Sequence, residues 1–119
     1  MIRALLVDDD VGPLEAIRAV FEMHGFEVVL SNDGKSALYQ ALQLGPDIVM
    51  TDFEMPHLDG VGLCQALRCH PRFREVPLIL TSGKSPPAGR HLWDAFLKKP
   101  VDFEILDELL SRAKRRLKG

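Results

Sequence analysis

The chain has 119 residues, a length that suits a single domain with one substantial core and no need of disulfide or metal staples. Its formal net charge of −2 gives no overall attraction to nucleic acid or to membranes. No window of about 18 residues is continuously apolar, and the acids that follow the first apolar run exclude a signal peptide. We therefore expect one cytoplasmic domain over residues 1–119, with Cys64 and Cys69 reduced.

Apolar runs of strand length alternate along the chain with helical patterns. The runs do not alternate polar with apolar residues, which is typical of strands covered on both faces in a parallel sheet. Strands that alternate with helices indicate a doubly wound α/β domain. The strands are expected at residues 4–7, 27–30, 47–50, 77–80 and 95–97, and the helical stripes at residues 14–21, 38–42, 63–67 and 106–117, the last capped by Asp102.

The segment between the fourth and fifth expected strands, residues 82–94, breaks this alternation. Pro86-Pro87 and two glycines exclude a helix through its first half, because proline lacks an amide donor and clashes with the preceding turn. At most a short helical turn is expected at Arg90–Trp93. We expect Trp93, with Leu92 and Pro86-Pro87, to cover the sheet face that a helix would otherwise cover. The alternative is a partly exposed Trp93 that forms a partner surface.

Charged side chains follow several of the expected strands. Asp8 and Asp9 end the first strand, Asp52 ends the third, and Lys99 follows the fifth. The carboxyl ends of parallel strands share one edge of a doubly wound sheet, so these groups should meet there. Carboxylates about 4 Å apart repel by roughly 4 kcal/mol at an effective dielectric near 20. Lys99 and a hard divalent cation such as Mg²⁺ would relieve that repulsion, an arrangement suited to an aspartate that attacks a phosphoryl group.

A simpler interpretation is that each aspartate only caps the helix that follows its strand. We expect this role for Asp10. It does not explain why acids, a hydroxyl and a lysine should all fall at one edge of the sheet.

Four motifs occur in a fixed order: "LLVDDD", "DIVMTDFEMPHLDG", "TSG" and "AFLKKP". Together, over the whole chain, they resemble the receiver domain of two-component response regulators. The resemblance implies a flavodoxin-like fold, with a five-stranded parallel sheet in the order 2-1-3-4-5. The stretch before Lys99 is shorter than is usual in that family, so we expect the fourth helix to be shortened or missing.

The resemblance also implies roles for particular residues and a cofactor, Mg²⁺ or Mn²⁺. A hydroxyl after the fourth strand is implied to bond the phosphoryl group; Ser82 is favoured for this role and Thr81 is its rival. The Lys99-Pro100 peptide is expected to be cis. Asp52 is the implied phosphoacceptor. The implied metal ligands are Asp9, Asp8 (through water), Asp52 and the Glu54 backbone carbonyl, Ser82 and Lys99 would contact the phosphoryl group, and Phe96 would be the switch aromatic. Glu54 and Lys84 flank the site, and their side chains are expected to pair across its entrance.

The function implied is a phosphoryl-accepting switch rather than a turnover enzyme. A histidine kinase or phosphotransfer protein would donate to Asp52, and a surface would then change toward an unknown output protein. No effector segment follows the last helix, so we expect a stand-alone receiver, and the basic residues at 112–118 suit a helix C-terminus better than a nucleic-acid site. Two alternatives stay open: a receiver-like binding module that acts without phosphorylation, and a phosphatase of the haloacid-dehalogenase type, which would want an aspartate where Glu54 stands.

Overall fold

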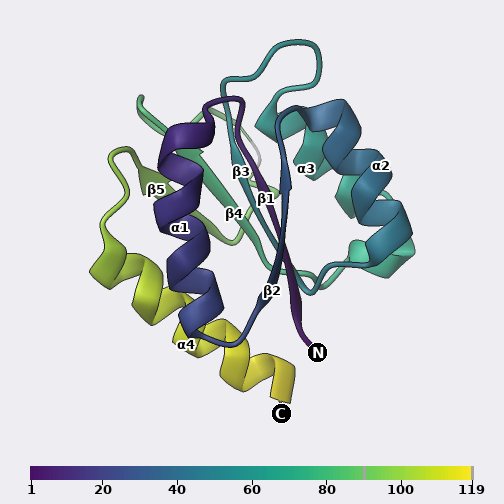
Figure 1. Cartoon of the computed structure of the whole chain (residues 1–119). Helices are drawn as coiled ribbons and strands as arrows, with labels where there is room; N and C mark the ends of the chain where they lie inside the picture. The colour runs from purple at the N-terminus through teal and green to yellow at the C-terminus, as the bar shows by residue number, and fades with distance from the viewer. Residues whose placement is uncertain (90, 119) are drawn as a thin grey trace.

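The computed structural model describes residues 1–89 and 91–118, and five parallel strands form one sheet through its centre (Figure 1). The spatial order β2-β1-β3-β4-β5 confirms the expected flavodoxin-like arrangement. The strands are β1 (Arg3–Val7), β2 (Glu27–Ser31), β3 (Ile48–Asp52), β4 (Leu78–Ser82) and β5 (Ala95–Lys98), each within two residues of its expected bounds.

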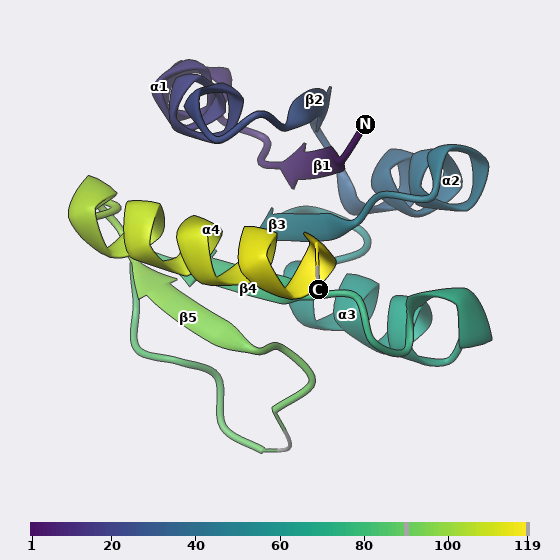
Figure 2. The same ribbon diagram turned by 90° about the horizontal axis from the view of Figure 1, so that it is seen from below.

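Among the described residues, four α-helices cover the two faces of the sheet. Helices α1 and α4 lie on one side, and α2 and α3 lie on the other (Figures 1 and 2). Asp10 begins α1 by accepting a hydrogen bond from the Gly12 amide at 3.3 Å, which confirms its expected role as a cap. The helices are α1 (Val11–Met23), α2 (Gly34–Leu44), α3 (Gly60–Arg68) and α4 (Phe103–Lys118), with a short 3₁₀ helix, η1, at Pro71–Phe73.

The strands read as continuously apolar because each one contributes to two hydrophobic cores. In β1, Ala4 and Leu6 pack with the buried residues of α1 and α4, whereas Leu5 and Val7 pack with those of α2 and α3. All four residues are at most 1% exposed. Burial on both faces therefore accounts for the absence of polar alternation in the sequence.

The connection between β4 and β5 contains no helix in the residues described, 83–89 and 91–94 (Figure 2). Trp93 is 7% exposed and packs in the core on the α2 and α3 side, with the half-buried Leu92 against it. These findings confirm the missing helix and the covering role of Trp93. At most a short helical turn was expected at Arg90–Trp93; residues 91–93 form none, and Arg90 lies outside the described residues.

The expected contribution of Pro86 to this cover is wrong, because Pro86 is exposed, whereas Pro87 is half-buried. The reason is the direction of the connection. Pro86 follows the carboxyl end of β4, whereas Trp93 lies two residues before β5, at the opposite edge of the sheet.

Arg68, at the end of α3, fastens this connection to the body of the domain. Its guanidinium donates to the backbone carbonyls of Leu92 at 3.0 Å and Val76 at 2.7 Å and pairs with the Asp94 carboxylate at 2.9 Å. Asp94 in turn accepts a hydrogen bond from the Leu78 amide at 2.8 Å.

In the part of the chain that the structure describes, no helix is long and apolar enough to cross a membrane.

Candidate acidic site at the carboxyl edge of the sheet

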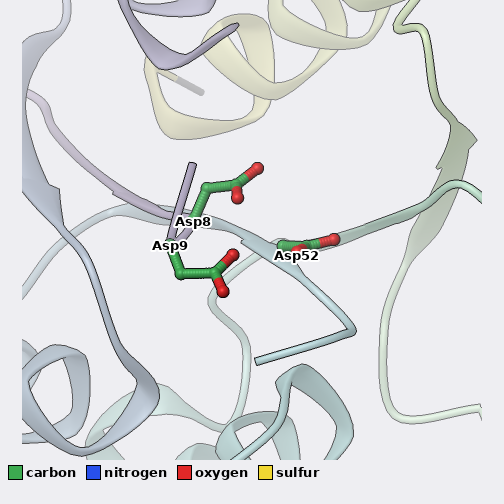
Figure 3. Close-up of side chains that lie close together, drawn as sticks. All are labelled: Asp8, Asp9 and Asp52. Atoms are coloured by element: carbon green, nitrogen blue, oxygen red, sulfur yellow. The ribbon is translucent and has the colours of Figure 1, made fainter. Parts of the chain in front are cut away.

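Three carboxylates meet where β1 and β3 end side by side. Asp8 and Asp9 follow β1 directly, and Asp52 is the last residue of β3. Each offers an oxygen within 4.8 Å of the other two (Figure 3). Asp8 is 3% and Asp52 is 5% exposed, whereas Asp9 lies at the surface. The topology of the sheet thus brings together the acids that the sequence placed at two separate strand ends.

Lys99, which directly follows β5, supplies the positive charge that compensates these carboxylates. Its Nζ atom lies 2.7 Å from Asp8 Oδ2 and 3.1 Å from Asp52 Oδ1. The Lys99 amide also donates to the Ser82 carbonyl at 2.8 Å, so the backbone beyond β5 stays aligned with β4. The Lys99-Pro100 peptide is cis, as the resemblance implied.

The two aspartates and the lysine change one another's protonation. Burial raises the pKa of Asp52 to about 6, the negative charge of Asp8 adds to this rise, and Lys99 opposes it. Burial acts to lower the pKa of Lys99, but its hydrogen bonds to Asp8 and Asp52 outweigh burial and raise it. Lys99 therefore stays charged near neutral pH, and Asp52 ionises more reluctantly than an ordinary aspartate.

The two hydroxyls at the end of β4 have different surroundings. Thr81 is buried, and its hydroxyl donates to the Thr51 carbonyl at 3.4 Å, below the edge of the sheet. Ser82 donates its hydroxyl hydrogen bond to the Glu54 carboxylate and accepts one from the Lys84 amide at 3.0 Å. Ser82 is thus the hydroxyl that reaches the loop after Asp52, which favours it over Thr81 for contact with a group on Asp52.

The expected pairing of Glu54 with Lys84 across the site entrance is not what the structure shows. Both residues lie in the described part of the chain, and no ion pair joins them. The Glu54 side chain bonds to Ser82 instead, and Lys84 takes part only through its backbone amide. Ser82 ends β4, which pairs directly with β3, whereas the Lys84 side chain is exposed, where an ion pair would contribute little. Phe96 is half-buried against the core on the α2 and α3 side.

The loop from Asp52 to α3 returns tightly to the strand end. The Gly60 amide donates to the Phe53 carbonyl at 2.9 Å, and a Cβ atom at Gly60 would overlap the Asp52 carbonyl oxygen. His57, at the outer turn, has φ of 70°, a backbone conformation that favours glycine. The glycine that closes "TDFEMPHLDG" is therefore required by the close approach to Asp52.

Comparison with known proteins settles the family. The family model described as "Response regulator receiver domain" matches residues 4–111. This chain belongs to the response regulator receiver family. The receiver is 36% identical over 121 residues to "Transcriptional regulatory protein PrrA" of Mycobacterium tuberculosis, which covers 98% of the chain and 50% of that protein. It is 31% identical to "DNA-binding dual master transcriptional regulator RpaA" of Synechocystis sp., covering 99% and 50%.

The receiver therefore spans about half the length of these curated relatives. Solved structures agree with the fold. The response regulator receiver domain (CheY-like) from Methylobacillus flagellatus is 28% identical with a TM-score of 0.84, covering 95% of this chain and 98% of that one. The receiver domain of sensor histidine kinase PA1611 from Pseudomonas aeruginosa, described with a magnesium ion coordinated in its active-site cleft, is 27% identical with a TM-score of 0.82, covering 93% and 95%.

Proposed function

We propose that this receiver is a phosphoryl-accepting switch in two-component signalling, with Asp52 as the acceptor. The observation that carries the proposal is the meeting of Asp8, Asp9 and Asp52 with Lys99 at one edge of the sheet. A carboxylate oxygen of Asp52 attacks the phosphorus of a phosphohistidine or acyl phosphate, the bond to the leaving group breaks, and that group leaves with the bonding electrons. The product is an aspartyl phosphate.

The acidic cluster fits a hard divalent cation. Three carboxylates with oxygens within 4.8 Å of one another form the oxygen-rich, negatively charged donor set that Mg²⁺ or Mn²⁺ prefers. Asp9 and Asp52 would hold the ion directly, Asp8 through water, and the Glu54 backbone carbonyl would add a further oxygen. When bound, the ion neutralises charge on the transferring phosphoryl group.

The remaining polar groups orient and stabilise the phosphoryl group. Lys99, already 3.1 Å from Asp52, supplies a positive charge to its oxygens. Ser82 donates a hydrogen bond to it, and Phe96 follows the movement of Ser82. The donor is a histidine kinase or a phosphotransfer protein, and the output is a changed protein-binding surface. Repeated substrate turnover is not part of this role.

Incubation with acetyl phosphate and Mg²⁺ followed by intact mass spectrometry tests the proposal. Wild type should gain the mass of one phosphoryl group, and neither Asp52→Asn nor wild type in EDTA should gain it. Asp10→Asn is a matched control, because Asp10 is a neighbouring acid that caps α1, and it should label like wild type. An unlabelled wild type would favour a binding module that acts without phosphorylation.

A further inference from the structure

The hydroxyl proton of Ser82 is already engaged in this structure. Ser82 is 0% exposed, and its Oγ atom accepts a hydrogen bond from the Lys84 amide and donates one to the Glu54 carboxylate. A serine hydroxyl carries one proton and can donate one hydrogen bond at a time. Ser82 therefore cannot donate to Glu54 and to a phosphoryl oxygen on Asp52 in the same state.

Glu54 is free to give up this contact. It lies two residues beyond Asp52, in the loop that leads to α3, and it is half-buried. Its carboxylate can turn into water, whereas the Ser82 side chain has no solvent to bond. The negative charge of Glu54 also contributes to the raised pKa of Asp52, which is consistent with a carboxylate close to the acceptor.

We propose that Glu54 is a positioning residue that holds the Ser82 hydroxyl in the unphosphorylated state, so that a phosphoryl group on Asp52 must displace it. This inference rests on the proposed function and deepens it. Each phosphorylation event exchanges the Glu54–Ser82 hydrogen bond for a Ser82–phosphoryl one. Glu54 thereby lowers the fraction of phosphorylated protein that reaches the switched arrangement of Ser82.

A second explanation predicts the same direction of effect. The charge of Glu54 would repel a phosphoryl group even if Ser82 were absent. The two explanations differ in their dependence on the hydroxyl. Displacement requires Ser82, whereas repulsion does not, so a double-mutant cycle separates them.

The measurement is the affinity for beryllium fluoride in the presence of Mg²⁺, by isothermal titration calorimetry. Beryllium fluoride binds to an aspartate oxygen and mimics the phosphoryl group without transfer. We expect Glu54→Ala to bind it about tenfold more tightly than wild type, because the Ser82 hydroxyl then no longer has to break a hydrogen bond to the Glu54 carboxylate. In a Ser82→Ala background, Glu54→Ala should change the affinity less than about twofold. Conversely, Ser82→Ala should cost more affinity in Glu54→Ala than in wild type.

Two controls accompany the cycle. Glu54→Asp keeps the charge but shortens the side chain, so it should release Ser82 and resemble Glu54→Ala. Glu75→Ala removes an exposed carboxylate from the turn before β4, at the opposite edge of the sheet, and should match wild type. Circular dichroism of each variant establishes that it is folded.

An equal effect of Glu54→Ala with and without Ser82 overturns the inference in favour of charge repulsion, and no effect in either background overturns it outright. In both cases wild type still binds beryllium fluoride, and the proposed function stands. A wild type that neither binds beryllium fluoride nor labels with acetyl phosphate would instead remove the proposed function and this inference together.

Discussion

The ammonium group of Lys99 lies 3.1 Å from a carboxylate oxygen of Asp52, across the edge of the sheet from β5 to β3. The same nitrogen is 2.7 Å from Asp8, so one positive charge serves two buried carboxylates. Removal of that charge leaves two buried carboxylates without a cationic partner, and among the described residues Asp8 keeps only the hydrogen bond that it accepts from the Asp10 amide at 2.9 Å.

Lys99→Met should therefore destabilise the metal-free protein at pH 7.5, by about 2 kcal/mol, less than a fully buried pair because Lys99 is partly exposed. The loss should shrink toward pH 5, where Asp52 takes up a proton. Urea denaturation in EDTA at both pH values measures it. Lys98→Met is the matched control, since Lys98 is an exposed neighbour of the same charge. Equal stability of the two variants would contradict the role of Lys99.

Asp52 should give the metal-free protein a characteristic pH dependence. Its pKa is about 6 in the folded protein against an ordinary value of 3.8, so the folded state holds this proton more tightly than the unfolded chain does. Its contribution to stability is therefore present below about pH 4 and is lost as the pH rises through about 6. The shift of the Asp52 pKa from 3.8 to about 6 corresponds to a loss of about 3 kcal/mol in the free energy of unfolding between about pH 4 and pH 7.

Asp52→Asn removes this titration. In EDTA it should exceed wild type in stability by up to about 3 kcal/mol above pH 6, and the difference should narrow toward pH 4. Denaturant titrations at intervals of one pH unit from 4 to 8 follow the change. A difference that does not vary with pH would show that Asp52 ionises normally in the folded protein.

Mg²⁺ should stabilise the protein by relieving repulsion among Asp8, Asp9 and Asp52, and the gain should grow with the logarithm of one plus the ratio of the Mg²⁺ concentration to its dissociation constant. Thermal unfolding with Mg²⁺ titrated up to millimolar concentrations should show a rising Tm for wild type and none for Asp9→Ala. Asp10→Ala, which removes the adjacent acid and a helix cap, should unfold earlier but keep the response to Mg²⁺. If Asp9→Ala still responds as wild type does, the ion binds elsewhere.

Trp93 should be a stability residue. It is 7% exposed and packs in the core on the α2 and α3 side, so Trp93→Ala should lower the free energy of unfolding by roughly 3–5 kcal/mol. Tyr39→Ala provides the control, because Tyr39 is 67% exposed and should cost less than about 0.5 kcal/mol. Weaker self-association with unchanged monomer stability in Trp93→Ala would mean that Trp93 forms an interface.

The fold was predictable because its signals are redundant along the chain. Every strand is an apolar run, every helix carries an apolar stripe, and helices begin at aspartates such as Asp10 and Asp102. The meeting of Asp8, Asp9 and Asp52 was predictable for a different reason. Parallel topology places all strand carboxyl ends at one edge, so the position of an acid in its strand determines where it lies.

Side-chain direction within loops was not predictable in the same way. The sequence placed Glu54 and Lys84 near the site, but only the structure shows that Glu54 bonds to Ser82 rather than to Lys84. The contacts of Arg68 were not predictable from the sequence either, because its partners include the backbone carbonyls of Val76 and Leu92, and every residue has such a carbonyl. Helical spacing places Arg68 at the end of α3 without indicating what it binds.

The central claim is that the phosphoryl group is carried by Asp52. After labelling with acetyl phosphate and Mg²⁺, reduction with borohydride converts an aspartyl phosphate to homoserine, and peptide mass spectrometry then locates the altered residue. We predict homoserine at position 52 in wild type treated with acetyl phosphate and Mg²⁺, and at no aspartate position in wild type treated with acetyl phosphate in EDTA. Homoserine at Asp8, Asp9 or another aspartate, with Asp52 unaltered, would contradict the account.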